Sequence, residues 1–513
     1  MKIPALLPLL LLGAAPAPPA VDLLIRGGTV YPGLATPFMG DVAVRGDRIV
    51  AVGPRLRVVA TRMIDARGLI VAPGFIDPHT HMGEALASPD AATRLIPAFL
   101  LQGVTTAFIG NDGGGPANVR AVLASTAGKP VGINFAAYVG FGTVRQAVIG
   151  AADRAPTAAE LSRMRGLVAR AMCDGAMGLS TGLFYAPQSF ARTDEVVALA
   201  TEAGTRGGLY DTHLRDESSY SIGLRAAVDE ALAIGRASGT AVNISHIKAL
   251  GVDVEGQSAA VIAAVERARA AGQRVTADQY PWSASGTSLA AALVPGWAQD
   301  GGRAALLKRF DDPAPAARLR TEMAENLRRR GGAARLLITD GPDAGQTLAD
   351  LAGGGDAVPA AIAAIRRQDA AVASFNQSER DITAFMARPW VMTGSDASTG
   401  HPRVWGSFAR KWAKYVRGGV LTRRQFVERS STLAAATFGL PGRGRLRAGA
   451  FADVVVFDPA RYAARADYAR PTLPAVGVRT VLVNGVVAVE GGRLTGAAAG
   501  RALPRMPTPG SCS

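Results

Sequence analysis

The chain has 513 residues, of which 48% are hydrophobic and only 6% aromatic, and it carries a formal net charge of +15. This length suits a barrel with an added domain and an insertion, and the core must rely on Ala, Val, Leu and Ile. Arginines carry most of the charge but are scattered apart from residues 328–330, without interleaved aromatics, so a nucleic-acid partner is not expected. The two cysteines, Cys173 and Cys512, give no disulfide framework; a bond between them is possible, with Cys512 expected in a loose tail.

The first twenty residues have the pattern of an export signal. Lys2 precedes a short apolar run at residues 6–15, and small residues and prolines follow. The run is too short to span a bilayer comfortably, although an uncleaved anchor stays open. No later stretch resembles a membrane span, so we expect a periplasmic or secreted protein without stable membrane insertion after signal cleavage.

Both ends of the remaining chain have the pattern of β-hairpins. Residues 21–72 alternate short apolar runs with turns, and residues 439–500 repeat this style. In the second segment Asn484-Gly485 separates two apolar runs, which is the strongest short-range hairpin signal. The two segments are therefore expected to form one small β-sandwich domain, followed by a tail at residues 501–513.

Between these segments, residues 73–438 alternate strand-like runs with Ala-rich helical stretches, which is typical of βα units around a parallel sheet. Eight runs are candidate strands: residues 74–81, 104–111, 132–139, 175–181, 209–214, 241–247, 274–280 and 389–396. The predicted fold class is α/β, a TIM-like (β/α)8 barrel. Residues 281–388, between the seventh and eighth strands, are too many for a βα loop. With helical stretches at 316–330 and 359–367, they are expected to form an inserted subdomain, either a lid or a structural addition.

Four of the five histidines stand at the ends of these strand-like runs. His79 and His81 are two residues apart and would share one side of a strand. His213, His246 and the carboxylate of Asp396 each end another run, so all five could meet at the catalytic face of a barrel. Any one of these histidines could be an ordinary core or surface residue, but the set favours a metal site. Imidazole and carboxylate suit zinc best, with manganese, iron or cobalt as alternatives.

Seven motifs along the chain resemble those of the amidohydrolase superfamily and, within it, the N-acyl-D-amino-acid deacylases (D-aminoacylases). They lie at residues 74–81 (GFIDPHTH), 178–185 (GLSTGLFY), 212–217 (THLRDE), 245–248 (SHIK), 278–282 (DQYPW), 394–396 (GSD) and 400–403 (GHPR). The first motif and GSD alone would indicate only the superfamily, whereas the middle ones are specific for the subgroup. The resemblance covers most of the chain after the export signal.

The resemblance implies a metal centre with one or two zinc ions. By it, His213 and His246 are ligands of a tightly held zinc, and His79 and His81 are ligands of a second, weaker position. Asp396 corresponds to the family's proton-shuttling carboxylate.

The same resemblance also implies roles in substrate binding and metal binding for further residues. Tyr185, Lys248 and Arg403 correspond to the family's clamp for the substrate carboxylate, although each could instead be a loop aromatic, a solvated charge or one of many scattered arginines. Where the family commonly has a cysteine ligand, this chain has Asp112, which either ligates metal or is a turn residue beside three glycines. His401 is expected to be a supporting or structural residue.

The implied activity is metal-dependent hydrolysis of the amide bond of N-acyl-D-amino acids, releasing a carboxylate and a free D-amino acid. A metal-dependent dipeptidase or cyclic-amide hydrolase on the same scaffold is the alternative enzyme, and a secreted binding protein is the non-enzymatic alternative. Asp396 argues against a binding protein, which needs no proton shuttle, while the substitution at Asp112 is its best support. The expected partner is a small N-acyl amino acid or peptide-like substrate; the acyl group, the side chain and the oligomeric state stay open.

Overall fold

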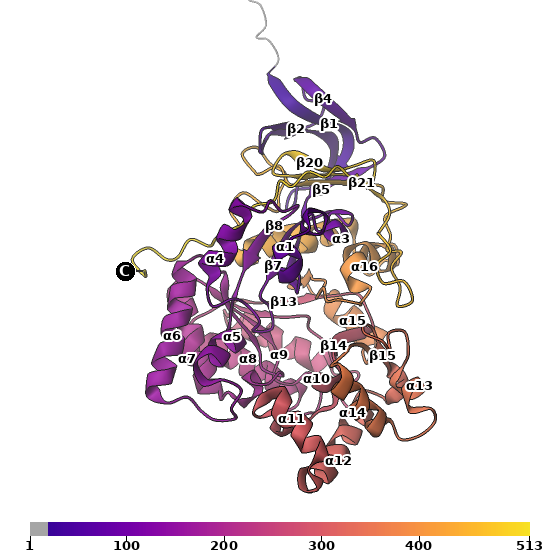
Figure 1. Cartoon of the computed structure of the whole chain (residues 1–513). Helices are drawn as coiled ribbons and strands as arrows, with labels where there is room; N and C mark the ends of the chain where they lie inside the picture. The colour runs from indigo at the N-terminus through magenta and orange to yellow at the C-terminus, as the bar shows by residue number, and fades with distance from the viewer. Residues whose placement is uncertain (1–18, 513) are drawn as a thin grey trace, which may run out of the picture.

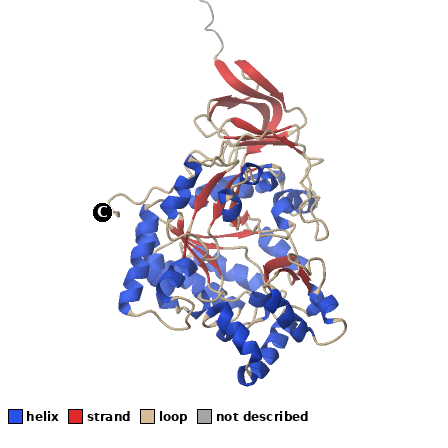
Figure 2. Ribbon diagram, viewed as in Figure 1, coloured by secondary structure: helices blue, strands red, loops and turns tan. Residues whose placement is uncertain are grey.

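The computed structural model describes residues 19–512 and shows three parts (Figure 1). A β-domain combines strands from the N-terminal and C-terminal parts of the chain, a barrel lies at the centre, and an insertion of helices and short strands packs beside the barrel (Figure 2). The predicted export signal at residues 1–20 lies almost wholly outside the described residues. Within residues 19–512, no helix is long and apolar enough to cross a membrane.

The β-domain is one hydrogen-bonded sheet of nine strands in the order β21-β20-β19-β18-β5-β1-β2-β3, with β4 paired to β1. The strands are β1 (Ala20–Val30), β2 (Phe38–Arg45), β3 (Arg48–Gly53), β4 (Val59–Asp65), β5 (Ile70–Pro73), β18 (Val454–Phe457), β19 (Val478–Val483), β20 (Val486–Glu490) and β21 (Arg493–Leu494). The antiparallel pair β5–β18 joins the two ends of the chain, as predicted. Asn484 and Gly485 turn the β19–β20 hairpin with φ of 47° and 83°, the left-handed conformation that such a turn requires.

The central part is a closed parallel barrel, which confirms the predicted fold class. Its strands are β6 (Phe75–Thr80), β7 (Val104–Ile109), β8 (Asn134–Ala137) continued as β9 (Val139–Gly140), β10 (Gly178–Gly182), β11 (Leu209–His213), β12 (Val242–Ile244), β13 (Val275–Gln279) and β17 (Val391–Thr393). They pair in this order, and a bridge between Thr80 and Ala397 closes the ring. All eight predicted runs contribute a strand.

Helices surround the barrel on the outside (Figure 1). They are α1 (Gly83–Ala87), α2 (Ala91–Arg94), α3 (Pro97–Leu100), α4 (Val119–Ala124), α5 (Phe141–Ile149), α6 (Ala158–Cys173), α7 (Thr193–Thr205), α8 (Leu224–Ser238), α9 (Ser258–Ala270), α15 (Glu379–Met386), α16 (Arg403–Arg410), α17 (Arg423–Val427) and α18 (Leu433–Phe438), with π-helical turns at Lys411–Val416 and Glu428–Thr432. The longest of these, α6, starts at a capping box of Thr157 and Glu160. It buries Met164, Val168 and Ala171, spaced as one face of a helix.

The insertion has a hydrophobic core of its own. Three short strands form its sheet, β14 (Ala284–Ser288), β15 (Leu336–Ile338) and β16 (Ala371–Phe375), in the order β14-β16-β15. Its helices are α10 (Leu289–Leu293), α11 (Gly302–Asp311), α12 (Pro313–Arg329), α13 (Leu348–Ala352) and α14 (Ala357–Arg367). The predicted helical stretches correspond to α12 and α14, whereas the sheet was not predicted.

The tail departs from expectation. Cys512 forms a disulfide with Cys173 at the end of α6. Before it, the backbone N–H groups of Leu503, Arg505 and Thr508 donate hydrogen bonds to carbonyls of the barrel part. The prediction of a loose tail was therefore wrong, because long-range backbone pairing and a covalent bond hold this segment against the barrel.

Candidate metal centre

The predicted ligands converge at the carboxyl ends of the barrel strands. His79 lies near the end of β6 and His81 directly follows this strand, His213 ends β11, and His246 follows β12. Asp112 and Asp396 follow β7 and β17, respectively. The polar side chains of five different strands thus face one another, as a parallel barrel requires.

Three of these residues have a strained backbone. Asp112, His246 and Asp396 adopt φ of 55°, 34° and 50°, which side chains other than glycine rarely take. Each stands two or three residues after the end of a barrel strand, in the loop that carries its side chain to the centre. Such strain is typical of functional sites.

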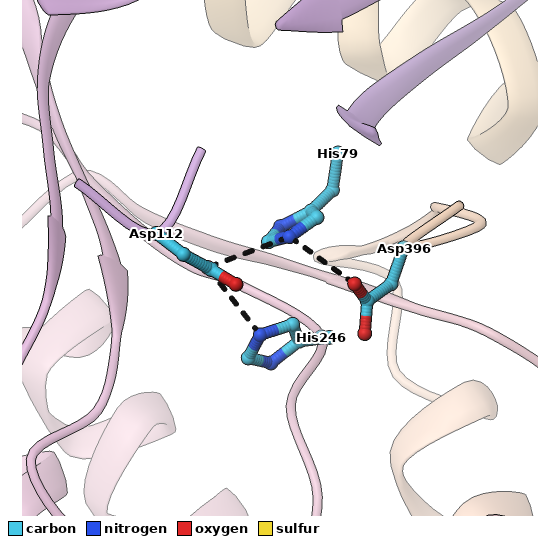
Figure 3. A group of neighbouring side chains, drawn as sticks. All are labelled: His79, Asp112, His246 and Asp396. Atoms are coloured by element: carbon cyan, nitrogen blue, oxygen red, sulfur yellow. Dashed lines mark ion pairs between the residues drawn. The ribbon is translucent and has the colours of Figure 1, made fainter. Parts of the chain in front are cut away.

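Asp112 contacts the imidazoles of the cluster, and Figure 3 shows its ion pairs with His79 and His246. Its carboxylate oxygens are 3.4 Å from His79 Nε2, 3.5 Å from His246 Nε2, 3.5 Å from His81 Nε2 and 3.7 Å from His213 Nδ1. Asp396 completes the group, with Oδ1 3.1 Å from His81 Nε2 and 3.5 Å from His79 Nε2. The structure thus brings together all six residues for which the sequence suggested a metal or proton-shuttle role.

These atoms form a donor set that fits a divalent metal ion. Ligand atoms of His79, Asp112, His246 and Asp396 all lie within 4.8 Å of one another. Both ring nitrogens of His79, Nδ1 of His213 and Oδ1 of Asp112 are buried without a hydrogen-bond partner. Unpaired buried polar atoms are costly, so the convergence of His79 Nε2 and His213 Nδ1 on the Asp112 carboxylate favours a cation such as zinc.

The electrostatics point the same way. Burial opposes a positive charge on His79, yet the carboxylates of Asp112 and Asp396 raise its pKa to about 10. The pKa of His246 rises to about 9, because Glu217 and Asp112 outweigh burial and the charge of Lys248. Burial would raise the pKa of Asp112, but His79 and His246 hold it well below the usual range. The carboxylates therefore favour protonated His79 and His246 when no metal is bound, whereas burial lowers the pKa of His213.

Glu217 is a supporting residue that sequence reasoning missed. Its side chain is 4% exposed, and Oε1 lies 2.6 Å from Lys248 Nζ and 3.3 Å from His246 Nδ1. Its Oε2 lies 3.5 Å from His213 Nε2. His246 Nδ1 also lies 2.7 Å from Lys248 Nζ, so Glu217 and Lys248 together fix the orientation of the imidazole. Glu217 is the last residue of the THLRDE motif at 212–217, but its position four residues after His213 is a common spacing, and no role was assigned to it.

The predicted carboxylate clamp lines a cavity of about 380 Å³ with its three residues, Tyr185, Lys248 and Arg403. The same cavity is lined by five residues of the metal-ligand cluster: His81, Asp112, His213, His246 and Asp396. Arg403 Nη1 lies 2.6 Å from Asp396 Oδ2, and Nη2 donates to Ser398 Oγ at 2.7 Å. A Cβ on Gly286 of β14 would lie 2.8 Å from Nη2, so any larger residue there would displace this guanidinium. The insertion therefore forms part of the wall around the site.

Three further side chains fix the backbone around the site. His401 accepts a hydrogen bond from the Arg403 N–H through Nδ1 at 3.1 Å, which agrees with a structural role. Asp77 accepts hydrogen bonds from the amides of His79 and Ser395, and Asp278 from that of His246. Burial raises the pKa of Asp77 to about 7. These buried carboxylates position the ligand-bearing loops.

The family model described as "Amidohydrolase family" matches residues 62–489. D-aminoacylase of Alcaligenes xylosoxydans xylosoxydans is 35% identical to this chain, covering 94% of it and 98% of the relative. N-acyl-D-glutamate deacylase of the same organism is 36% identical over 91% of this chain and 93% of its own. Among solved structures, N-acyl-D-glutamate deacylase from Bordetella bronchiseptica, complexed with zinc and a phosphonate inhibitor that mimics the tetrahedral intermediate, superposes with a TM-score of 0.79 at 33% identity. That match covers 94% of this chain and 100% of the other.

Proposed function

Since the chain belongs to the amidohydrolase family, we propose that it hydrolyses the amide bond of N-acyl-D-amino acids to a carboxylate and a free D-amino acid. The observation that carries this proposal is a single cavity in which a metal-type ligand cluster and the carboxylate of Asp396 adjoin two cations, Lys248 and Arg403. The similarity to named deacylases over more than nine-tenths of the chain supports it.

We assign the metal-holding role to His79, His81, Asp112, His213 and His246, as ligands of one or two zinc ions. When bound, zinc polarises an amide carbonyl and lowers the pKa of water from about 15.7 to about 7. The zinc in the Bordetella structure and the unpartnered nitrogens of this cluster support that choice of metal.

Asp396 is placed to move the proton. The Arg403 guanidinium and nearby imidazoles outweigh burial and hold the pKa of Asp396 far below its usual range, so its carboxylate is ionised at neutral pH. It can therefore accept a proton from the attacking water and pass it to the leaving amine. A substrate carboxylate that binds Arg403 competes for the guanidinium, which makes Asp396 a better base once substrate is present.

The clamp orients the substrate. Arg403 offers a planar fork of donors, and the Lys248 ammonium adds a second positive charge, so an α-carboxylate placed between them is held in one direction. Tyr185 packs against His213, with ring centroids 4.8 Å apart, and limits how the bound amide can rotate.

Release of free amine tests the proposal. Zinc-loaded protein is assayed with N-acyl-D-amino acids, their L enantiomers and dipeptides, beside an Asp396→Asn variant. Activity confined to the D compounds and lost in the variant is expected. Preferential turnover of dipeptides would move the assignment to a dipeptidase, and bound zinc without any turnover would favour a binding protein.

We also propose that the protein is exported to an oxidising compartment. The pattern of residues 1–20 supports this, and so does the Cys173–Cys512 disulfide, because disulfides persist outside the reducing cytosol. Mass spectrometry of the mature N-terminus from cell fractions tests it: cleavage near residue 20 in the periplasm or medium is expected, and an intact cytosolic chain would contradict it.

A further inference from the structure

Arg330 lies at the C-terminal end of α12 in the insertion and lines the same cavity as the metal-ligand cluster. It is 2% exposed. Its Nε donates to the carbonyl of Ala292 at 3.1 Å, whereas Nη1 is buried without any hydrogen-bond partner. No carboxylate of the described chain lies within ion-pair distance of this guanidinium, although a buried arginine is ordinarily paired.

The other lysine and arginine side chains around the cavity are already paired. Arg403 pairs with Asp396, and Lys248 pairs with Glu217. The nearby carboxylate of Asp216 accepts hydrogen bonds from the amides of Ser218, Ser221 and Gly223 and is thereby satisfied. Within residues 19–512, Arg330 is the cation of this cavity that lacks a counter-ion.

A row of aromatic rings connects Arg330 with the metal centre. Its guanidinium carbon lies 5.6 Å from the centroid of the Tyr220 ring. Tyr220 meets Phe184 edge to face at 5.3 Å, and Phe184 stacks on His213 at 5.8 Å. Tyr220 and Phe184 thus form an apolar wall along which the hydrocarbon part of a ligand could lie, with an anionic end at Arg330.

We propose that Arg330 binds a second carboxylate of the substrate, so that the enzyme prefers N-acyl-D-amino acids with an acidic group beyond the α-carboxylate. This rests on the proposed function, in which Tyr185, Lys248 and Arg403 hold the α-carboxylate. The second carboxylate comes from the side chain of D-aspartate or D-glutamate, or from a dicarboxylic acyl group such as succinyl. Overall similarity does not decide the point, since the D-aminoacylase and the N-acyl-D-glutamate deacylase resemble this chain about equally.

The test compares kcat/KM of the zinc-loaded full chain on N-acetyl-D-glutamate, N-succinyl-D-leucine and N-acetyl-D-leucine. In wild type, at least one acidic substrate should exceed N-acetyl-D-leucine. Arg330→Met should lower kcat/KM for that substrate on the order of 10²-fold, as expected for loss of one partner of a buried charge pair, and change N-acetyl-D-leucine by less than about threefold. Arg330→Lys should retain part of the preference, and it replaces the Met variant if that variant does not fold.

Arg328→Gln is the matched control, because Arg328 lies on the same helix end but is exposed and pairs with Asp253 and Glu325. It should leave all three substrates within about threefold. A loss confined to N-acetyl-D-glutamate assigns the carboxylate to the amino-acid side chain, and a loss confined to N-succinyl-D-leucine assigns it to the acyl group. An equal loss on all three substrates, or a wild-type preference for N-acetyl-D-leucine, overturns the proposal.

A binding experiment separates this inference from the proposed function. Calorimetric affinities for glutarate and for valerate, which has one carboxylate fewer, are compared in wild type and Arg330→Met. Glutarate should bind wild type at least about tenfold more tightly than valerate, and the variant should lose most of that ratio. If no N-acyl-D substrate is turned over but Arg330→Met still loses the preference for glutarate over valerate, only the proposed activity is wrong. If the glutarate-to-valerate affinity ratio is the same in wild type and variant, the role of Arg330 is overturned.

Discussion

The role of Asp112 can be tested by replacing it with asparagine. The substitution keeps the size of the side chain and the tolerance for φ of 55°, since Asn also adopts the left-handed region, but it removes the negative charge. A metal ligand would suffer from that loss, whereas a turn residue beside glycines would not. The two interpretations of this position therefore predict different zinc affinities.

The size of the effect follows from the geometry. The Asp112 carboxylate is 3.4 Å from His79 Nε2, and two unit charges at that distance interact by about 5 kcal/mol at an effective dielectric constant of 20. Removing one partner of a buried charge pair costs about 3–5 kcal/mol. We therefore expect Asp112→Asn to weaken zinc binding by between about 10² and 10⁴, at about 1.4 kcal/mol per factor of ten.

The measurement is competition for zinc between the metal-free protein and a chromophoric chelator at pH 7.5. Asp90→Asn is the control, because Asp90 is an exposed cap of α2, and its affinity should match wild type. If Asp112→Asn holds zinc within threefold of wild type, Asp112 is not a ligand and the reasoning from its contacts fails.

Three further predictions follow from other contacts. Gly286→Ala should lower kcat/KM at least about tenfold by displacing the clamp arginine, with zinc affinity unchanged; Gly166→Ala, where a Cβ has open space, should stay within twofold of wild type in the same assays. Because His79 and His246 have pKa values raised to about 10 and about 9, both are protonated at pH 7 without metal, so zinc affinity should rise from pH 6 to pH 9. Calorimetry in buffers of different ionisation enthalpy should then detect nearly two protons released per ion, and none released would contradict the raised pKa values. Cys173→Ser should destabilise the fold by about 2–4 kcal/mol in thermal unfolding without loss of activity at 25 °C, while a reducing agent destabilises only wild type.

The barrel could be predicted because its signals are local. Each strand is a short apolar run, and ligands such as His79 and His246 stand at the ends of such runs, where the topology of a parallel barrel brings them together. The β19–β20 hairpin was equally local, since Asn484-Gly485 specifies its turn.

Other features depend on contacts between distant residues. Glu217 reaches His246 only because the loops after β11 and β12 pack together. The strands of the insertion are short, and β14 pairs with β16 across more than eighty residues. The sequence therefore has no periodic pattern that predicts this sheet. Cys512 meets Cys173 over a separation of 339 residues. Local patterns carry no information about such pairings.

The resemblance implies a cysteine ligand where this chain has Asp112. That exchange preserves the charge of the ligand set, because a thiolate and a carboxylate both carry one negative charge, but it replaces a soft donor with a hard one. The change should therefore affect metal preference more than the ability to bind a divalent cation. Among the carboxylates that face the cavity, Asp396 is paired with Arg403 and Glu217 with Lys248, whereas Asp112 contacts imidazoles and no lysine or arginine of the described chain. The Asp112 carboxylate is therefore free to bind a metal ion, just as the unpaired guanidinium of Arg330 in the insertion is free to bind an anion. Each of these two unmatched charges identifies the kind of ligand that would neutralise it: a divalent cation at the barrel mouth and a carboxylate at the insertion.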